Sequence, residues 1–150
     1  MSSEPCLFCG ITAGSIPSYR IAESENLLAF LDIAPVRSGH VLIVPRVHHA
    51  YFEDLSPELA AEVVQLGQRV AKALKAIYGV GRVAFMFTGN DFAHAHAHLI
   101  PMVSSDDVTS RRYIAEEVVT YRQPPRLPAA EQQETAARIR AELAKDQASA

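Results

Sequence analysis

The sequence lacks any apolar run close to the ~20 residues that cross a bilayer. Its first residues also lack the basic start and apolar core of a signal peptide. We therefore expect a cytoplasmic protein that has no membrane partner. Cysteine is scarce, and its two copies, Cys6 and Cys9, would lie in a reducing compartment, where a structural disulfide is not expected.

An excess of basic residues is missing as well. Fourteen Lys and Arg stand against seventeen Asp and Glu, which gives a net charge of −3. Because duplex nucleic acid is bound through clustered Lys and Arg, we expect no nucleic-acid partner, whereas a small anionic ligand remains possible. The 150 residues, 49% hydrophobic and 21% charged, suit one globular domain.

Hydrophobic periodicity and turn residues predict an α+β fold built on an antiparallel sheet. The clearest element is a long helix between Ser56, an N-cap residue followed by proline, and Gly79, a helix stop. We expect the last helix to be mostly solvated, because its apolar positions are largely alanine. The other expected elements are a helix at 5–13, strands at 19–23, 26–33, 41–44, 82–88 and 94–102, and a helix at 129–145.

The most distinctive feature is the alternating run of His94, His96 and His98. In a strand all three side chains point to one face. Each buried imidazole needs a partner for its ring N–H, so three of them are costly as core filling. The run is compatible with a partly solvated polar face, a zinc site or nucleophilic attack of a neutral imidazole on phosphorus. Spacing alone does not separate the last two uses.

Cys6 and Cys9 form a Cys-x-x-Cys motif. Such a pair can be half of a metal site, a redox pair or two incidental buried thiols. A redox role is disfavoured, because the surrounding sequence lacks a thioredoxin-like βαβ context.

Four patches of the sequence together resemble the histidine triad (HIT) family, whose signature is His-φ-His-φ-His-φ-φ. The resemblance covers about residues 5–103, so we expect a HIT domain core at 1–103. A C-terminal extension at 104–150 would add a loop and a terminal helix. The resemblance implies an antiparallel sheet of about five strands with a long central helix and a short N-terminal helix, usually in a homodimer. The patches are Cys6-Leu7-Phe8-Cys9, Asp32-Ile33-Ala34-Pro35, the segment 38–48 and the triad with its flanks.

The resemblance also implies an activity. Family members are nucleotide hydrolases and transferases that act at the α-phosphate, here of purine nucleoside phosphoramidates or dinucleoside polyphosphates. The central histidine, His96, would attack phosphorus to form a nucleotidyl-histidine, and His98 would donate to the phosphate oxygens. His40 matches an additional active-site histidine, although the bare sequence also allows a residue that simply begins a strand.

The implied nucleotide site draws on two separate segments of the chain. Asp32 matches the residue that binds the ribose hydroxyls, and a carboxylate suits this task because it accepts two hydrogen bonds. The bare sequence allows equally that Asp32 caps a turn. Leu31 and Ile33 would flank the base. The loop with Asn90 and Asp91 would face the phosphate.

Some HIT members join the cysteine pair to two histidines around a structural zinc ion. On this chain the matching set is Cys6, Cys9, His48 and His94, a closed Cys₂His₂ site. His49 competes with His48, but neighbours on an extended segment face opposite ways. The family spacing from Pro45 favours His48.

Two other functions stay open. Asp91 stands where the family commonly carries serine or threonine, and a carboxylate repels an anionic phosphate. The chain could therefore be a nucleotide-binding or partner-binding regulatory HIT protein with little turnover. A hydrolase that uses the triad to hold a catalytic zinc is disfavoured, because Cys6 and Cys9 offer the metal a separate place.

Overall fold

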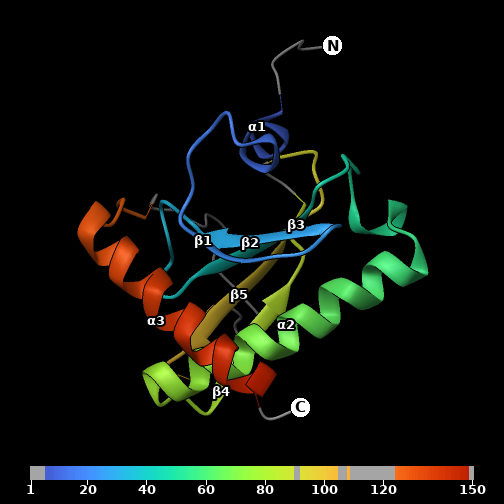
Figure 1. Cartoon of the computed structure of the whole chain (residues 1–150). Helices are drawn as coiled ribbons and strands as arrows, with labels where there is room; N and C mark the ends of the chain where they lie inside the picture. The colour runs from blue at the N-terminus through green and yellow to red at the C-terminus, as the bar shows by residue number, and fades with distance from the viewer. Residues whose placement is uncertain (1–5, 90–91, 105–107, 109–123, 149–150) are drawn as a thin grey trace, which may run out of the picture.

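The computed structural model describes residues 6–89, 92–104, 108 and 124–148. Within them, five strands form one antiparallel sheet in the order β1-β2-β3-β5-β4 (Figure 1). The α+β architecture and the HIT-like arrangement of a short N-terminal helix and a long central helix are confirmed. The elements are α1 (Leu7–Ala13), β1 (Arg20–Glu23), β2 (Leu27–Leu31), β3 (Val41–Pro45), a 3-10 turn (Phe52–Asp54), α2 (Pro57–Tyr78), β4 (Arg82–Met86), β5 (Ala97–Met102) and α3 (Ala129–Ala148).

The long helix α2 begins and ends at the predicted residues. The Ser56 hydroxyl accepts a hydrogen bond from the Leu59 N–H at 3.1 Å, which satisfies one of the unpaired amides of the first turn. Gly79 ends the helix with a φ of 65°, a conformation that glycine adopts without steric cost. The buried face of α2, with Val63, Val70 and Leu74 fully covered, packs on the sheet.

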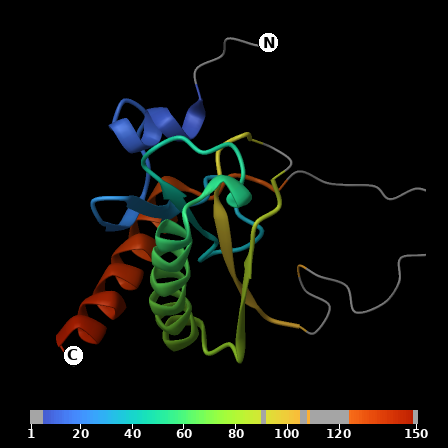
Figure 2. The ribbon, with the colours of Figure 1, turned by 90° about the vertical axis from the view of Figure 1, so that its right-hand side faces the viewer.

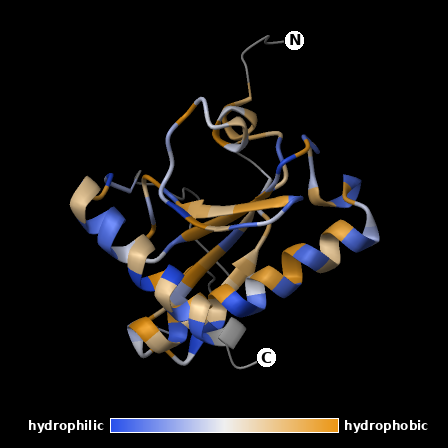
Figure 3. Ribbon diagram, viewed as in Figure 1, coloured by the Kyte–Doolittle hydropathy of each residue, from blue (hydrophilic) through white to orange (hydrophobic). Residues whose placement is uncertain are grey.

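The two faces of the sheet support different structures. On one face, Leu27, Ala29 and Leu31 of β2 belong to a large core between the sheet and the helices α2 and α3 (Figure 1). On the other face, Leu28 and Phe30 belong to a smaller core with α1. Both β2 and β3 are buried on both faces, and their sequences are accordingly apolar at consecutive positions (Figure 3). The smaller core leaves room on its face for polar side chains.

The C-terminal helix α3 packs on the body of the protein beside α2 and β1 (Figure 2). Ala136, Ile139 and Leu143 are buried in the large core. The expectation of a mostly solvated helix is therefore wrong: alanine allows a close approach, and two polar residues occupy the rest of the buried face. The division of the chain at residue 103 stays a prediction.

Strand β5 begins at Ala97, three residues later than predicted. Its ladder with β3 ends at the pair Ile43–Ala97. The preceding segment is held instead by a 2.7 Å hydrogen bond from the Ala95 N–H to the His49 carbonyl. His94 and His96 therefore lie in the segment that leads into the strand, with His94 at a bend, rather than in the ladder. Among the helices of the described ranges, none combines the length and apolarity that crossing a bilayer requires.

Candidate active site and metal cluster

The triad histidines gather on the α1 face of the sheet. His98 pairs with Leu42 across β3 and β5, and Leu42 belongs to the small core on that face. Phe8 of α1 packs against the other two histidines, with its ring centroid 5.7 Å from that of His94 and 5.0 Å from that of His96. The aromatic side chain of the Cys-x-x-Cys turn thus covers the lead-in to β5.

A nearby backbone carbonyl sets the tautomer of His96. Its Nδ1 lies 2.7 Å from the backbone carbonyl oxygen of His94, which can only accept, so the Nδ1–H donates. The lone pair of the neutral ring then lies on Nε2. His96 is only 4% exposed, and its ring centroid is 4.8 Å from that of His98. An imidazole with a fixed, unprotonated nitrogen is the arrangement that nucleophilic attack requires.

A second chain of hydrogen bonds orients His98. The Val36 N–H donates to His40 Nδ1 at 3.2 Å, which places the ring proton of neutral His40 on Nε2. That Nε2 lies 2.9 Å from His98 Nδ1 and donates to it. His98 therefore carries its proton on Nε2, which lies 3.4 Å from the Thr88 hydroxyl. This hydrogen-bond relay from Val36 through His40 to His98 leaves the Nε2–H of His98 as a donor that points away from the core.

Burial keeps His40 in the uncharged form that this relay needs. Desolvation lowers the pKa of His40, the nearby Asp32 carboxylate opposes this, and His96 adds to it. One oxygen of Asp32, Oδ1, accepts the Ala34 N–H at 2.8 Å, which caps the turn as the bare sequence allowed. The other oxygen, Oδ2, lies 3.8 Å from His40 Nδ1. Asp32, His40, His98 and His96 thus form one continuous line of contacts.

The two residues predicted to contact the base, Leu31 and Ile33, differ in their exposure. Ile33 is 46% exposed and is available to a ligand. Leu31 is 1% exposed and packs in the large core under α2, so its predicted contact with the base is wrong: strand alternation turns it to the opposite face. Asn90 and Asp91 lie outside the described residues.

The second cluster joins Cys6, Cys9, His48 and His94, whose ligand atoms all lie within 4.8 Å of one another. His94 Nδ1 is 3.3 Å from Cys6 Sγ and 3.6 Å from Cys9 Sγ, and His48 Nδ1 is 3.4 Å from Cys9 Sγ. In a tetrahedral zinc site with ordinary bond lengths, neighbouring ligand atoms lie roughly 3.3–3.8 Å apart. These four residues could hold a metal ion. The ring of His49 is not in the cluster.

The hydrogen bonds and acidities of the cluster suit a cation. His94 Nε2 donates to the Pro45 carbonyl at 2.9 Å, which leaves Nδ1 unprotonated toward the two thiols. Burial lowers the pKa of His94, against the effect of that hydrogen bond. Burial, and then the adjacent Cys6, raise the pKa of the Cys9 thiol. A divalent cation would offset the cost of the Cys9 thiolate, because a coordinating thiol is deprotonated.

A second group of residues, Asp32, His40 and His98, is less suited to bind a metal ion. Asp32, His40 and His98 also bring ligand atoms within 4.8 Å. The direct 2.9 Å hydrogen bond between the two rings, however, already satisfies one nitrogen of each. This pairing weighs against a catalytic zinc held by the triad, while Cys6 and Cys9 provide a more complete ligand set.

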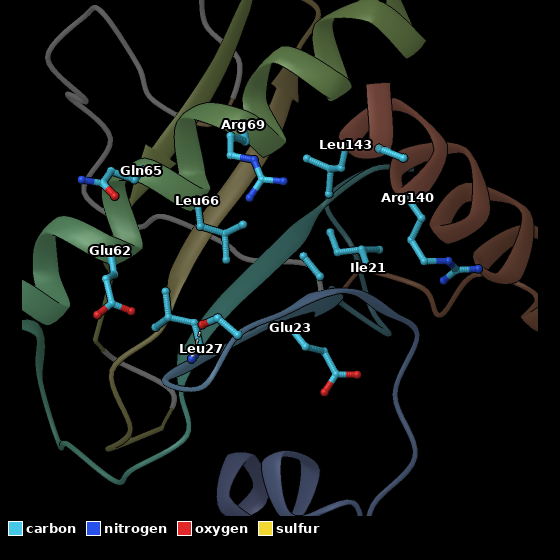
Figure 4. Close-up of a pocket in the computed structure, with 12 residues that line it drawn as sticks. Ile21, Glu23, Leu27, Glu62, Gln65, Leu66, Arg69, Arg140 and Leu143 are labelled. Carbon is cyan, nitrogen blue, oxygen red and sulfur yellow. Dashed lines mark hydrogen bonds between the residues drawn. The ribbon is translucent and has the colours of Figure 1, made fainter. Parts of the chain in front are cut away.

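Two cavities adjoin these elements. A cavity of about 260 Å³ opens beside His96 and is also lined by Tyr51, Phe87, Thr88 and Gly89. A larger cavity of about 430 Å³ lies between the β1–β2 hairpin, α2 and α3, and its lining contains no histidine or cysteine (Figure 4). Ile21, Leu27, Leu66 and Leu143 of that lining belong to the large core, so the cavity lies on the face opposite the triad.

Comparison with known proteins agrees with this geometry. The family model described as the HIT domain matches residues 13–104, more than half of the chain. The chain belongs to the histidine triad (HIT) family.

Relatives of this HIT protein include two named enzymes. The chain is 40% identical over 101 residues to adenosine 5'-monophosphoramidase of Schizosaccharomyces pombe, covering 64% of this chain and 73% of the relative. It is 35% identical over 131 residues to an uncharacterized HIT-like protein of Mycobacterium tuberculosis, covering 81% and 85%. A zinc-bound histidine triad family protein from Mycobacterium smegmatis superposes with a TM-score of 0.76 at 28% identity, covering 99% of this chain and 100% of that one. The second enzyme, adenosine 5'-monophosphoramidase of Saccharomyces cerevisiae, is 37% identical over 97 residues, covering 64% and 61%.

Sequence reasoning missed three groups of residues around the site. Phe8 was visible only as part of the cysteine motif, and Thr88 only as part of a strand. Gln132 and Thr135 lie on the otherwise apolar stripe of α3, next to Ala136 and Ile139. Two polar residues on a buried helical stripe are a signal that a closer examination of the helical periodicity could have found.

Proposed function

We propose that this HIT protein is a nucleotide hydrolase or transferase that acts at the α-phosphate through a nucleotidyl intermediate on His96. The observation that carries the proposal is the hydrogen bond from His96 Nδ1–H to the His94 carbonyl, since it fixes an unprotonated Nε2 beside His98. The cavity beside His96 offers space for the group bonded to phosphorus. The substrate would enter with its ribose at Asp32.

The first step forms a bond between His96 Nε2 and the α-phosphorus while the bond to the leaving group breaks. The electron pair of that bond stays on the leaving phosphate or on the leaving amine, and the amine takes up a proton from solvent. His98, held by His40, donates its Nε2–H to a phosphate oxygen, where negative charge develops. In the second step water attacks phosphorus and gives up a proton to solvent, while the P–N bond to His96 breaks and restores the free imidazole.

The relatives in two yeasts are named adenosine 5'-monophosphoramidases. We therefore propose an adenosine, or more generally a purine, nucleoside phosphoramidate as the first substrate to test, with a dinucleoside polyphosphate as the second. Ile33, exposed beside Asp32, is the described side chain we assign to the base. Asn90 and Asp91 remain proposed phosphate-loop residues.

We also propose that Cys6, Cys9, His48 and His94 hold one structural zinc ion. Three sulfur–nitrogen separations of 3.3–3.6 Å, which suit a tetrahedral site, support this, as does the zinc-bound relative from Mycobacterium smegmatis. When bound, the ion supplies a cross-link between α1 and the lead-in to β5. The cytoplasmic location stays a prediction that agrees with thiols kept reduced for a metal.

The experiment is to incubate the protein with adenosine 5'-phosphoramidate and with a dinucleoside polyphosphate, following AMP release. We expect hydrolysis by the wild type and by His49→Ala, whose ring lies outside the metal cluster. His96→Ala should lose at least roughly 10³-fold in kcat, because its nucleophile is gone. Full activity of His96→Ala contradicts the mechanism. Binding of AMP with turnover of neither substrate favours the regulatory alternative.

A further inference from the structure

The C-terminal helix α3 buries two polar side chains. Gln132 is 2% exposed and Thr135 is 4% exposed, and they lie three residues apart on one side of the helix. The rest of the buried face is apolar, with Ala136, Ile139 and Leu143. A buried amide or hydroxyl destabilises a core unless it is hydrogen-bonded, so two of them together on one face point to a specific pair of partners.

Both partners lie in the loop that precedes β3. Gln132 Nε2 donates to the backbone carbonyl of Asp32 at 2.6 Å. Thr135 Oγ1 lies 3.2 Å from Ser38 Oγ, which in turn lies 3.1 Å from the Tyr78 hydroxyl at the end of α2. The helix therefore holds the loop near each of its ends, about 100 residues away in the sequence.

The loop transmits this support to the site because it is braced internally. The Asp32 N–H donates to the His40 carbonyl at 3.0 Å, and the Val36 N–H donates to the His40 ring. Gly39 has a φ of 88°, and an added Cβ would lie 2.6 Å from the Tyr78 ring, so the turn fits closely against α2. A displacement of the Asp32 carbonyl would move the carboxylate of Asp32, whereas the Val36 N–H and His98 still hold the ring of His40.

We propose that α3 is a structural part of the nucleotide site and that Gln132 is a positioning residue, which holds Asp32 where it meets the ribose hydroxyls. The inference rests on the proposed nucleotide function and adds to it a residue outside the HIT match at 13–104. Gln132 touches the backbone of Asp32 and acts on the ligand through it. Its contribution should therefore depend on the ribose hydroxyls and not on the phosphate.

Arg140, about two helical turns after Gln132 in α3, offers a matched control. Arg140 Nη1 donates to the backbone carbonyl of Arg20 in β1 at 2.6 Å, so it too links a side chain of α3 to a sheet carbonyl. It lines the cavity on the face away from the triad (Figure 4). Arg140→Met removes the same kind of contact as Gln132→Met, at a place with no connection to Asp32.

The test measures binding of AMP and of 2′,3′-dideoxy-AMP by calorimetry, with kcat and KM for adenosine 5'-phosphoramidate and a melting curve for each variant. For Gln132→Met we expect the Kd of AMP and the KM to rise roughly tenfold, as for one lost hydrogen bond, with kcat changed less than about twofold. Its Kd for the dideoxy nucleotide should stay near the wild-type value. Arg140→Met should keep the wild-type preference for the hydroxyls.

Three outcomes separate the possibilities. If Gln132→Met binds AMP as the wild type does, or weakens both nucleotides equally, the positioning role is overturned. If the wild type neither binds nor hydrolyses nucleotides, the proposed function itself fails. Should Gln132→Met not fold, Thr135→Val, nearly equal in shape, replaces it: a smaller loss of the same hydroxyl preference supports the proposal, and an unchanged preference overturns it.

Discussion

At the scale of single residues, backbone groups decide which ring nitrogen of each histidine is available. The carbonyl of His94 fixes His96, the carbonyl of Pro45 fixes His94, and the amide of Val36 fixes His40. None of these contacts involves a charged partner. Each contact selects the tautomer that the neutral ring adopts, one suited to attack, one to metal binding and one to orient His98.

The buried His40 makes stability depend on pH. Because burial lowers its pKa below the ordinary value of 6.5, the unfolded chain binds a proton more readily than the folded chain. The contribution of neutral His40 to the free energy of unfolding is thus fully present above about pH 6.5. It is lost as the pH falls below that value, by at most about 1.4 kcal/mol per pH unit. Asp32 opposes this loss, while His96 and His98 are the other titratable groups that face the ring.

Urea unfolding of the wild type and of His40→Gln at pH 7.5, 6.5 and 5.5 checks this. The amide stays neutral throughout, so we expect the wild type to lose more stability on acidification than the variant does. Equal losses in the two proteins would show that His40 is not a buried neutral group.

At the scale of elements, the proposed zinc site would attach α1 to the rest of the fold. Cys6 and Cys9 lie at the start of α1, His48 follows β3, and His94 precedes β5. We expect about one zinc per chain in protein purified without chelator. Removal of the ion by a chelator, or Cys9→Ser, should lower the Tm by roughly 5–15 °C, the shift expected when a tightly bound ligand is lost.

Metal analysis and thermal melts test this, with His49→Ala as the control that keeps the ion. A wild-type preparation that contains no metal and melts at the same temperature with and without chelator would rule out the site.

The packing of α3 can be tested by a deletion in its buried face. Ile139 is fully buried in the large core, so Ile139→Ala should cost about 2–5 kcal/mol of unfolding free energy. Gln133→Ala, on the exposed side of the same helix, should stay within about 0.5 kcal/mol. Denaturant unfolding measures both, and a small loss for Ile139→Ala would return α3 to the status of a solvated helix.

The sequence predicts elements well where the signals are local. Helix α2 carries its own cap, its stop and a regular apolar stripe, so its bounds follow from neighbours in the chain. Helix α3 was misjudged because its buried face depends on partners far away, such as the Asp32 carbonyl for Gln132. The same reason hides the tautomer of His94, since Pro45 comes from another segment. Leu31 was misassigned because strand alternation was not applied to it.

At the scale of the whole molecule, we expect a homodimer through the β4 edge of the sheet. Phe85 of β4 is 41% exposed and packs close to Gly67 of α2. Val64, one helical turn before Gly67, is 48% exposed on the same side. Within the described residues β4 is an edge strand, and such an edge beside exposed apolar side chains is typical of an interface.

Analytical ultracentrifugation tests the dimer. The wild type should sediment as a dimer, and Val64→Glu should shift it toward monomer by placing a charge in the interface. The exposed substitution Glu58→Ala, in the first turn of α2, serves as the control. A wild type that stays monomeric at high micromolar concentration contradicts the expectation.

The identity of the nucleophile unites the histidine geometry with the family's chemistry, and one measurement tests it most directly. The protein is quenched with denaturant during turnover of adenosine 5'-phosphoramidate, digested, and the peptide between Arg82 and Arg111 is fragmented by mass spectrometry. We expect an adenylyl group on His96 alone, and no adduct in His96→Ala. An adduct on His94 or His98, or continued turnover by His96→Ala, would contradict His96 as the nucleophile.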